Sequence, residues 1–253
     1  MKYIFMVAGK GTRLNPLTLK HPKSMFKLDS KTTLLQRMVS LIKKIDVDSD
    51  IVVVTGHMHK SIEKSLNDVT FVYNPFFEFT NSIASLWFAR EHLDAENIVL
   101  IDGDIVMPEL LMRNIVCQPV NKPTVLLDSS ICTDGDYNVE VSGEHVLVMS
   151  KDLEAYYGEY AGITKLDQRS ALLMREEMNS MIEEGFFDQW YENALVQMIF
   201  KNDFKLYFED ICEFDWTEVD SVNDLLHARS IYAKDLQLSH KNGDENKNEL
   251  QRL

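Results

Sequence analysis

The sequence predicts an α/β protein with three layers, α/β/α, around a mixed, mostly parallel sheet. Through the first hundred residues, apolar runs of four to seven residues alternate with segments whose apolar residues have helical spacing. Runs of this length with no polar alternation are typical of strands that are buried on both faces. Alternating strands and helices predict a parallel sheet with helices on both of its faces.

Each element of the first half follows from a local pattern. The helix expected over 33–45 places six apolar residues on one face and charged residues opposite. The other expected helices span 59–66 and 82–91, and the second of these begins directly after Asn81. The expected strands are the apolar runs at 2–8, 51–55, 70–73 and 97–101.

The pattern changes after Pro123. Strands are expected at 124–128 and 205–208, and a hairpin at 137–141 and 145–150, because Ser142-Gly143-Glu144 is a turn sequence between two apolar runs. Helices are expected at 166–184, 192–200 and 221–236, followed by a polar end from 240 that is expected to fray. With no repeat or linker, we expect one domain at 1–236 and a polar tail at 237–253.

Composition excludes several classes of protein. The chain has 253 residues and a formal net charge of -14, which argues against nonspecific binding to nucleic acid. No apolar stretch approaches the length of a membrane helix, so we expect no membrane insertion. The scattered Cys117, Cys132 and Cys212 predict reduced structural thiols, and the first apolar run is too short for a signal peptide, so we expect a cytoplasmic protein. No pattern indicates an oligomeric state.

The first 28 residues contrast with the acidic remainder. They hold six Lys or Arg residues and no Asp or Glu, which suggests an anionic ligand. Within them, the turn Gly9-Lys10-Gly11-Thr12 follows a strand and lets backbone N–H groups approach a phosphate. It is not a P-loop, and Leu14 stands where a dinucleotide fingerprint needs its third glycine. On the glycines alone, a plain turn with solvated basic residues is an equally good interpretation.

The ordered motifs are more specific than the glycines. Ala8-Gly9-Lys10-Gly11-Thr12-Arg13-Leu14, Pro16-Leu17-Thr18 and Pro22-Lys23-Ser24 resemble the signature of the nucleotidylyltransferases that activate sugar phosphates and related phosphomonoesters. The resemblance implies a Rossmann-like, GT-A-like fold and a loop of Ala8, Gly9, Lys10, Gly11 and Thr12 around a nucleoside triphosphate. It also implies that Arg13 holds the β- and γ-phosphates and Lys23 meets the α-phosphate. Fixed cations there would stabilise the charge that builds up in the transition state.

The same resemblance implies a magnesium site. Asp104 and Asp220 match the metal-binding positions of the family, and Asp102 is expected beside them near the nucleotide. Asp102-Gly103-Asp104 ends an expected strand, where ligands bind in open α/β sheets, and carboxylate oxygens suit Mg²⁺. The alternative is structural: Asp102 as a turn residue and Asp220 as the N-cap of the last helix.

The resemblance to one branch of the family extends over roughly residues 1–230, and it is loosest over residues 108–155. The segments 74–89, 159–166 and 187–195 resemble the phosphocholine cytidylyltransferases of bacterial surface-polymer synthesis. This resemblance implies CTP as the nucleotide and a small phosphorylated amine or phosphonate as the acceptor. Asn81 and Ser82 are candidates for nucleotide contacts, with a helix cap as the equal alternative.

Aromatic and acidic residues cluster in the second half and suggest how an acceptor amine would bind. A quaternary ammonium binds over aromatic faces beside a carboxylate, at about 0.5–2 kcal/mol per face. Trp190 and Glu192 are the preferred pair, followed by Tyr160, although each aromatic alone is as easily explained as core. The expected reaction is CTP plus a phosphorylated amine giving a CDP-linked product and pyrophosphate, with Mg²⁺.

Two alternatives stay open at this point. A sugar-1-phosphate nucleotidylyltransferase is disfavoured because the segment Glu-Lys-Pro of those enzymes is replaced by Met149-Ser150-Lys151-Asp152. A nucleotide-binding module without catalysis is disfavoured because the basic pair and both aspartates are present.

Overall fold

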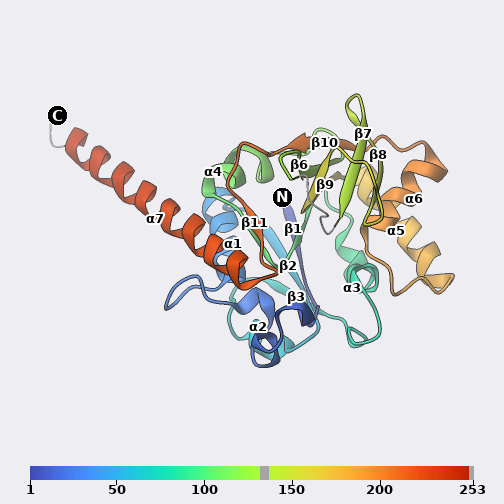
Figure 1. The fold of residues 1–253 in the computed structure, drawn as a ribbon, viewed down its shortest axis with the longest axis horizontal. Helices are drawn as coiled ribbons and strands as arrows, with labels where there is room; N and C mark the ends of the chain where they lie inside the picture. The colour runs from blue at the N-terminus through green and yellow to red at the C-terminus, as the bar shows by residue number, and fades with distance from the viewer. Residues whose placement is uncertain (132–136, 251–253) are drawn as a thin grey trace.

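The computed structural model describes residues 1–131 and 137–250, and Cys132 lies outside these residues. Its central feature is a mixed sheet of nine strands in the order β3-β2-β1-β4-β9-β6-β10-β8-β7 (Figure 1). Helices cover both faces, so the expected three-layer α/β class is confirmed. None of the helices in the described residues combines the length and apolar character needed to cross a membrane.

Half of the sheet is parallel, as the apolar runs predicted. Its strands are β1 (Lys2–Val7), β2 (Asp50–Thr55), β3 (Thr70–Tyr73) and β4 (Asn97–Asp102). β1 pairs with β2 and β4, and β2 with β3, all in parallel register. The carboxyl ends of β1 and β4 therefore lie side by side.

The other half of the sheet is mainly antiparallel. Its strands are β6 (Thr124–Asp128), β7 (Asn138–Ser142), β8 (His145–Ser150), β9 (Gly158–Asp167) and β10 (Tyr207–Asp210). β7 and β8 form the expected hairpin, and β6 and β10 add a further parallel pair. β9 joins the two halves because it runs antiparallel to both β4 and β6.

β9 was not predicted, and residues 166 and 167 were wrongly assigned to the following helix. The strand is buried on both faces, so it has no alternation, and it carries the polar Thr164 and Lys165 in its middle. The Lys165 ammonium donates to the carbonyls of Ile115 and Gln118, which allows its burial. Hydrogen bonds to residues far away in the chain thus stabilise a central strand whose sequence is unusual for that position.

Six helices form the outer layers. α1 (Leu34–Ile45), α2 (His59–Glu63) and α4 (Glu109–Leu111) pack on one face, where Tyr3 and Phe5 of β1 point. α3 (Ser82–Phe88), α5 (Gln168–Glu183) and α6 (Glu192–Asn202) pack on the other, where Ile4 points. The opposite directions of neighbouring β1 side chains follow from the two-residue period of a strand.

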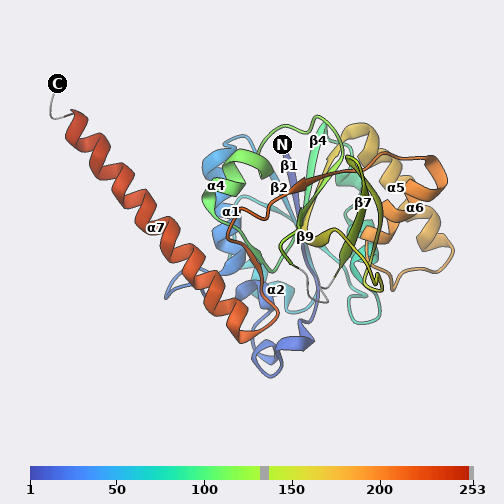
Figure 2. The same cartoon turned by 45° about the horizontal axis from the view of Figure 1, so that its top comes forward.

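The last helix, α7 (Val222–Leu250), is longer than the expected 221–236. The frayed end predicted from 240 is helical as far as Leu250, and the helix passes the predicted domain boundary at 236 unbroken. The added segment contains no proline, which would end a helix, but it does contain Gly243 and three asparagines, and this composition is why the sequence did not predict the extension. Its first turns pack on a small core with Ala228 and Ile231, and its far end projects from the body (Figures 1 and 2).

Candidate active site

A cavity of about 420 Å³ opens at the carboxyl ends of β1 and β4, where open α/β sheets bind ligands. The structure brings all the predicted site residues to its wall. Those expected to bind nucleotide or metal, or to act on phosphate, are Ala8, Gly9, Lys10, Gly11, Thr12, Arg13, Lys23, Asn81, Ser82, Asp102, Asp104 and Asp220. Those expected to bind the acceptor are Tyr160, Trp190 and Glu192.

The glycine turn after β1 has a conformation that only glycine adopts easily. Gly11 has a φ of 63°, in the left-handed region. A Cβ atom there would lie 3.1 Å from Thr18 Cγ2 and 3.2 Å from Lys23 Cβ. The Thr18 hydroxyl donates to the Gly11 carbonyl at 2.9 Å. Thr18, the last residue of the Pro16-Leu17-Thr18 motif, therefore stabilises the glycine turn next to Lys23. The Lys10 ammonium lies 3.2 Å from Glu78 Oε1.

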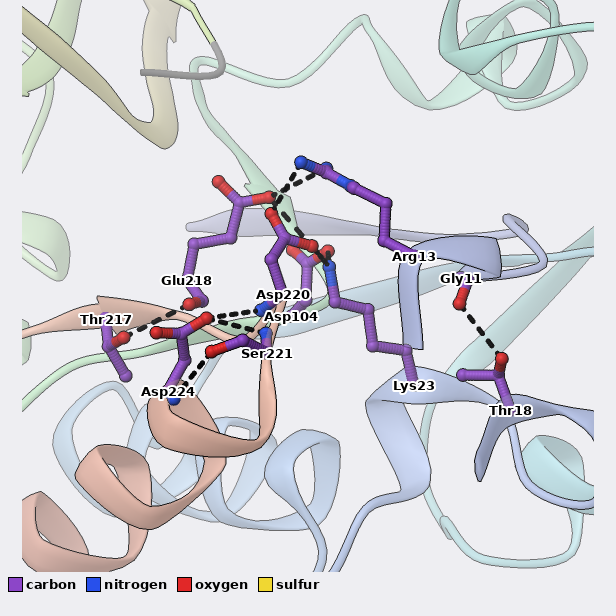
Figure 3. A network of polar contacts seen from close by, with 10 residues as sticks. All are labelled: Gly11, Arg13, Thr18, Lys23, Asp104, Thr217, Glu218, Asp220, Ser221 and Asp224. Carbon is purple, nitrogen blue, oxygen red and sulfur yellow. Dashed lines mark hydrogen bonds and ion pairs between the residues drawn. The ribbon is translucent and has the colours of Figure 1, made fainter. Parts of the chain in front are cut away.

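An ionic network crosses the cavity floor (Figure 3). The Lys23 ammonium lies 2.7 Å from Asp104 Oδ2, contacts Asp220 Oδ1 and is 4.0 Å from Glu218 Oε1. Arg13 pairs with Asp220 Oδ2 at 2.9 Å. Burial opposes the charge on Lys23, but the carboxylates outweigh it, so the pKa of Lys23 is raised and the ammonium stays charged.

Short structural elements hold the carboxylates in place. β5 (Ile105–Val106) pairs with β11 (Thr217–Glu218), and Val219 donates to the Asp104 carbonyl at 3.0 Å. Asp104 and Asp220 are thereby brought together across more than a hundred residues of chain. Gly103 fits tightly on β1, because a Cβ there would lie 2.1 Å from Val7 Cγ1.

Asp220 is not the N-cap of α7, which was the structural alternative for this residue. The cap is a reciprocal pair in which Asp224 N–H donates to Ser221 Oγ and Ser221 N–H donates to Asp224 Oδ2. The Asp220 carboxylate is therefore left to face Lys23 and Arg13. Asp102 is the last residue of β4, paired with Met6, rather than a residue of a loose turn.

Three carboxylates could hold a divalent cation. Oxygens of Asp104, Glu218 and Asp220 lie within 4.8 Å of one another, a hard-oxygen set. Asp104 Oδ1 is buried and has no hydrogen-bond partner in the described residues, so it has the capacity for a further ligand. Glu218 was not predicted as a ligand, although its spacing of two from Asp220 along an extended segment was a usable signal.

The far end of the cavity is aromatic and acidic, and we call it the aromatic end: Tyr137, Lys151, Tyr160, Trp190 and Glu192. The Tyr160 hydroxyl bonds to Thr164 Oγ1 at 2.8 Å and to the Tyr191 hydroxyl at 2.7 Å.

Acidic groups near this end resist ionisation. Burial raises the pKa of Glu192 to about 7. Burial, and then the charge of Glu192, raise the pKa of Asp102. A cation at the aromatic end would therefore favour the ionised form of Glu192.

Asn81 and Ser82 line the cavity at the start of α3. Asn81 Oδ1 accepts the Ser82 N–H at 2.8 Å at the start of α3, and Ser82 Oγ accepts the Tyr191 N–H at 2.8 Å. The helix-cap alternative for Asn81 is therefore present in the structure, and its contact with a nucleotide stays a prediction. Tyr137, Lys151 and Phe77 also line the cavity and were not predicted. Phe77 lies within the matched segment 74–89, whereas no motif marks Tyr137 or Lys151.

Comparisons with known proteins bear on the family and the fold. Residues 2–122, a little under half of the chain, match the family model of the nucleotidyl transferases, the family that the opening motifs resemble. The chain is 25% identical to choline-phosphate cytidylyltransferase of Streptococcus pneumoniae over 239 residues, which are 91% of this chain and 98% of that protein.

Two solved structures share the fold. CTP:phosphocholine cytidylyltransferase from Streptococcus pneumoniae superposes with a TM-score of 0.72 at 22% identity, over 91% of this chain and 98% of that one. The inositol-1-phosphate CTP transferase from T. maritima also has a TM-score of 0.72, at 17% identity, over 91% and 95% of the two chains. The Rossmann-like nucleotidyltransferase fold is confirmed.

Proposed function

We propose that this protein is a Mg²⁺-dependent cytidylyltransferase that transfers CMP from CTP to a small phosphorylated amine and releases pyrophosphate. The observation that carries the proposal is one cavity lined both by the cations Arg13 and Lys23 and by the aromatic end. A phosphorylated amine has the matching charges: its phosphate would face Lys23 and its ammonium would face Glu192. The name of the pneumococcal relative supports both CTP and the amine.

The chain's own residues would act mainly by position and charge. An oxygen of the acceptor phosphate attacks the α-phosphorus of CTP and forms the new P–O bond. The bond from the α-phosphorus to the oxygen bridging to the β-phosphate breaks, and pyrophosphate leaves with that electron pair. Lys23 and Arg13 would neutralise the charge that develops on the α-phosphate and on the leaving group. No side-chain nucleophile is needed, because the acceptor phosphate is already anionic at neutral pH.

Asp104, Glu218 and Asp220 would hold the metal. Bound Mg²⁺ would supply further positive charge to the triphosphate in this cavity. The Lys23 ammonium lies among the same carboxylates. In contact with the α-phosphate, Lys23 would exchange these carboxylate contacts for oxygens of the triphosphate.

The test is pyrophosphate release from CTP and Mg²⁺ with phosphocholine or phosphoethanolamine, against a reaction without acceptor. Acceptor-dependent release is expected with at least one of the two amines. Glucose 1-phosphate in the same assay tests the sugar alternative. Binding of CTP with no acceptor-dependent release from any of these compounds would overturn the proposal and favour a module that only binds nucleotide.

A further inference from the structure

One buried oxygen at the aromatic end lacks a hydrogen-bond donor. Glu192 is 3% exposed, and its Oε2 has no partner in the described residues. A buried carboxylate oxygen without a donor is costly, and native proteins rarely leave one unsatisfied. Because Glu192 lines the cavity, the missing donor is accounted for by a ligand that enters it.

The surroundings of Glu192 select a cation. Tyr137, Tyr160 and Trp190 form the adjoining wall, with aromatic rings that attract positive charge. A buried acid beside three aromatic rings favours a positively charged headgroup over a neutral one.

The protein itself places a primary ammonium at this wall. The Lys151 ammonium lies over the Trp190 ring, 4.4 Å from its centroid. Its charge favours the ionised form of Glu192, against the larger effect of burial, which raises the pKa of that group. An ammonium of this size and hydrogen-bonding capacity therefore fits beside the ring.

Resting on the function proposed above, we propose that the acceptor carries a protonated amine with at least one N–H group, as in a phosphoethanolamine, and that Glu192 binds this amine through Oε2. A trimethylammonium group would satisfy the aromatic faces equally well. It has no N–H, however, and would leave Oε2 buried without a donor. The preference between the two headgroups is thus set by Glu192 rather than by the rings.

The experiment is a methylation series on the full-length wild-type protein. Pyrophosphate release is measured with CTP, Mg²⁺ and phosphoethanolamine, its N-methyl and N,N-dimethyl derivatives, and phosphocholine. We expect kcat/KM to fall most at the last step, where the final N–H is lost, by roughly tenfold or more. Because the series needs no mutation, its outcome does not depend on whether a variant folds.

Glu192→Gln then tests the residue. We expect the ratio of kcat/KM between phosphoethanolamine and phosphocholine to shrink to about threefold or less, since the neutral amide loses the charge-assisted bond. Glu177→Gln is the matched control, because Glu177 is also buried but lies on α5 outside the cavity, bonded to Lys201. It should keep the wild-type ratio.

The two proposals fail in different ways. Phosphocholine used as well as or better than phosphoethanolamine overturns the headgroup inference and leaves the cytidylyltransferase proposal standing. An unchanged acceptor ratio in Glu192→Gln also overturns the inference. Release with none of the four amines, in protein that binds CTP, overturns both.

Discussion

Replacing Lys23 by alanine should change catalysis and metal binding in opposite directions. The Lys23 side chain is 11% exposed, and its ammonium pairs with Asp104 and Asp220. Losing a fixed cation at the developing charge should lower kcat by about 10²- to 10³-fold, as for the loss of one preorganised donor. The same change frees the carboxylates for a metal.

The effect on metal binding can be worked from the geometry. Without the ammonium, three carboxylate oxygens lie within 4.8 Å of one another. At an effective dielectric constant of about 20, two such charges repel each other by about 3.5 kcal/mol. Screening by water reduces the effect of each pair on the free energy of unfolding to about 1–2 kcal/mol. Mg²⁺ relieves this repulsion, so the variant should bind it at least about tenfold more tightly without nucleotide.

Two measurements check this prediction. Turnover is followed as pyrophosphate release, and metal binding as the rise in Tm when Mg²⁺ is added to nucleotide-free protein. Lys20→Ala is the control, because Lys20 is exposed and is not among the cavity-lining residues. Turnover within threefold of wild type would remove Lys23 from the mechanism. An equal Tm rise in both proteins would refute its competition with metal.

Three further predictions concern the stability of the folded protein. Gly103→Ala should lower the unfolding free energy by about 1–3 kcal/mol in urea denaturation, since its Cβ would overlap Val7; wild-type stability would contradict the tight packing. Burial raises the pKa of Glu192 from about 4.5 in the unfolded chain to about 7 in the folded protein. Between these pH values the folded protein binds more protons than the unfolded chain, so its free energy of unfolding falls as the pH rises. Glu192→Gln should therefore be more stable than wild type by about 3 kcal/mol at pH 8 but not at pH 4, and equal gains at both would refute this. Asp235→Ala should cost about 3 kcal/mol in thermal unfolding because it leaves the buried Arg37 without its partner, and a loss below about 1 kcal/mol would argue against that pair.

The parallel half of the fold could be predicted because its signals are local. Buried parallel strands such as β2 are continuous apolar runs, and α1 carries a clear apolar face after its Thr33 cap. β9 carries no such signal. Its Lys165 is acceptable only because carbonyls some fifty residues away accept its hydrogen bonds, a condition that no local window contains.

The same distinction applies to the site. Residues within one short motif, such as Arg13 and Lys23, could be assigned from their order, and the structure places both at the cavity. Glu218 belongs to a two-residue strand whose position depends on its pairing with β5, far away in the sequence. Tyr137 and Lys151 come from the segment with the weakest motifs, and only the folding of the β7–β8 hairpin brings them to the cavity.

β9 runs antiparallel to both β4 and β6, and this arrangement bears on how acceptor choice can change among related proteins. The glycine turn, Lys23 and Asp104 come from the first 104 residues, whereas the aromatic end is built from residues 137–192. The two sets meet where β4 and β9 run side by side, with Ile101 opposite Ile163. A change of headgroup would need substitutions in the second set alone. A chimera that exchanges residues 137–192 between two relatives is therefore expected to exchange acceptor choice and keep the nucleotide.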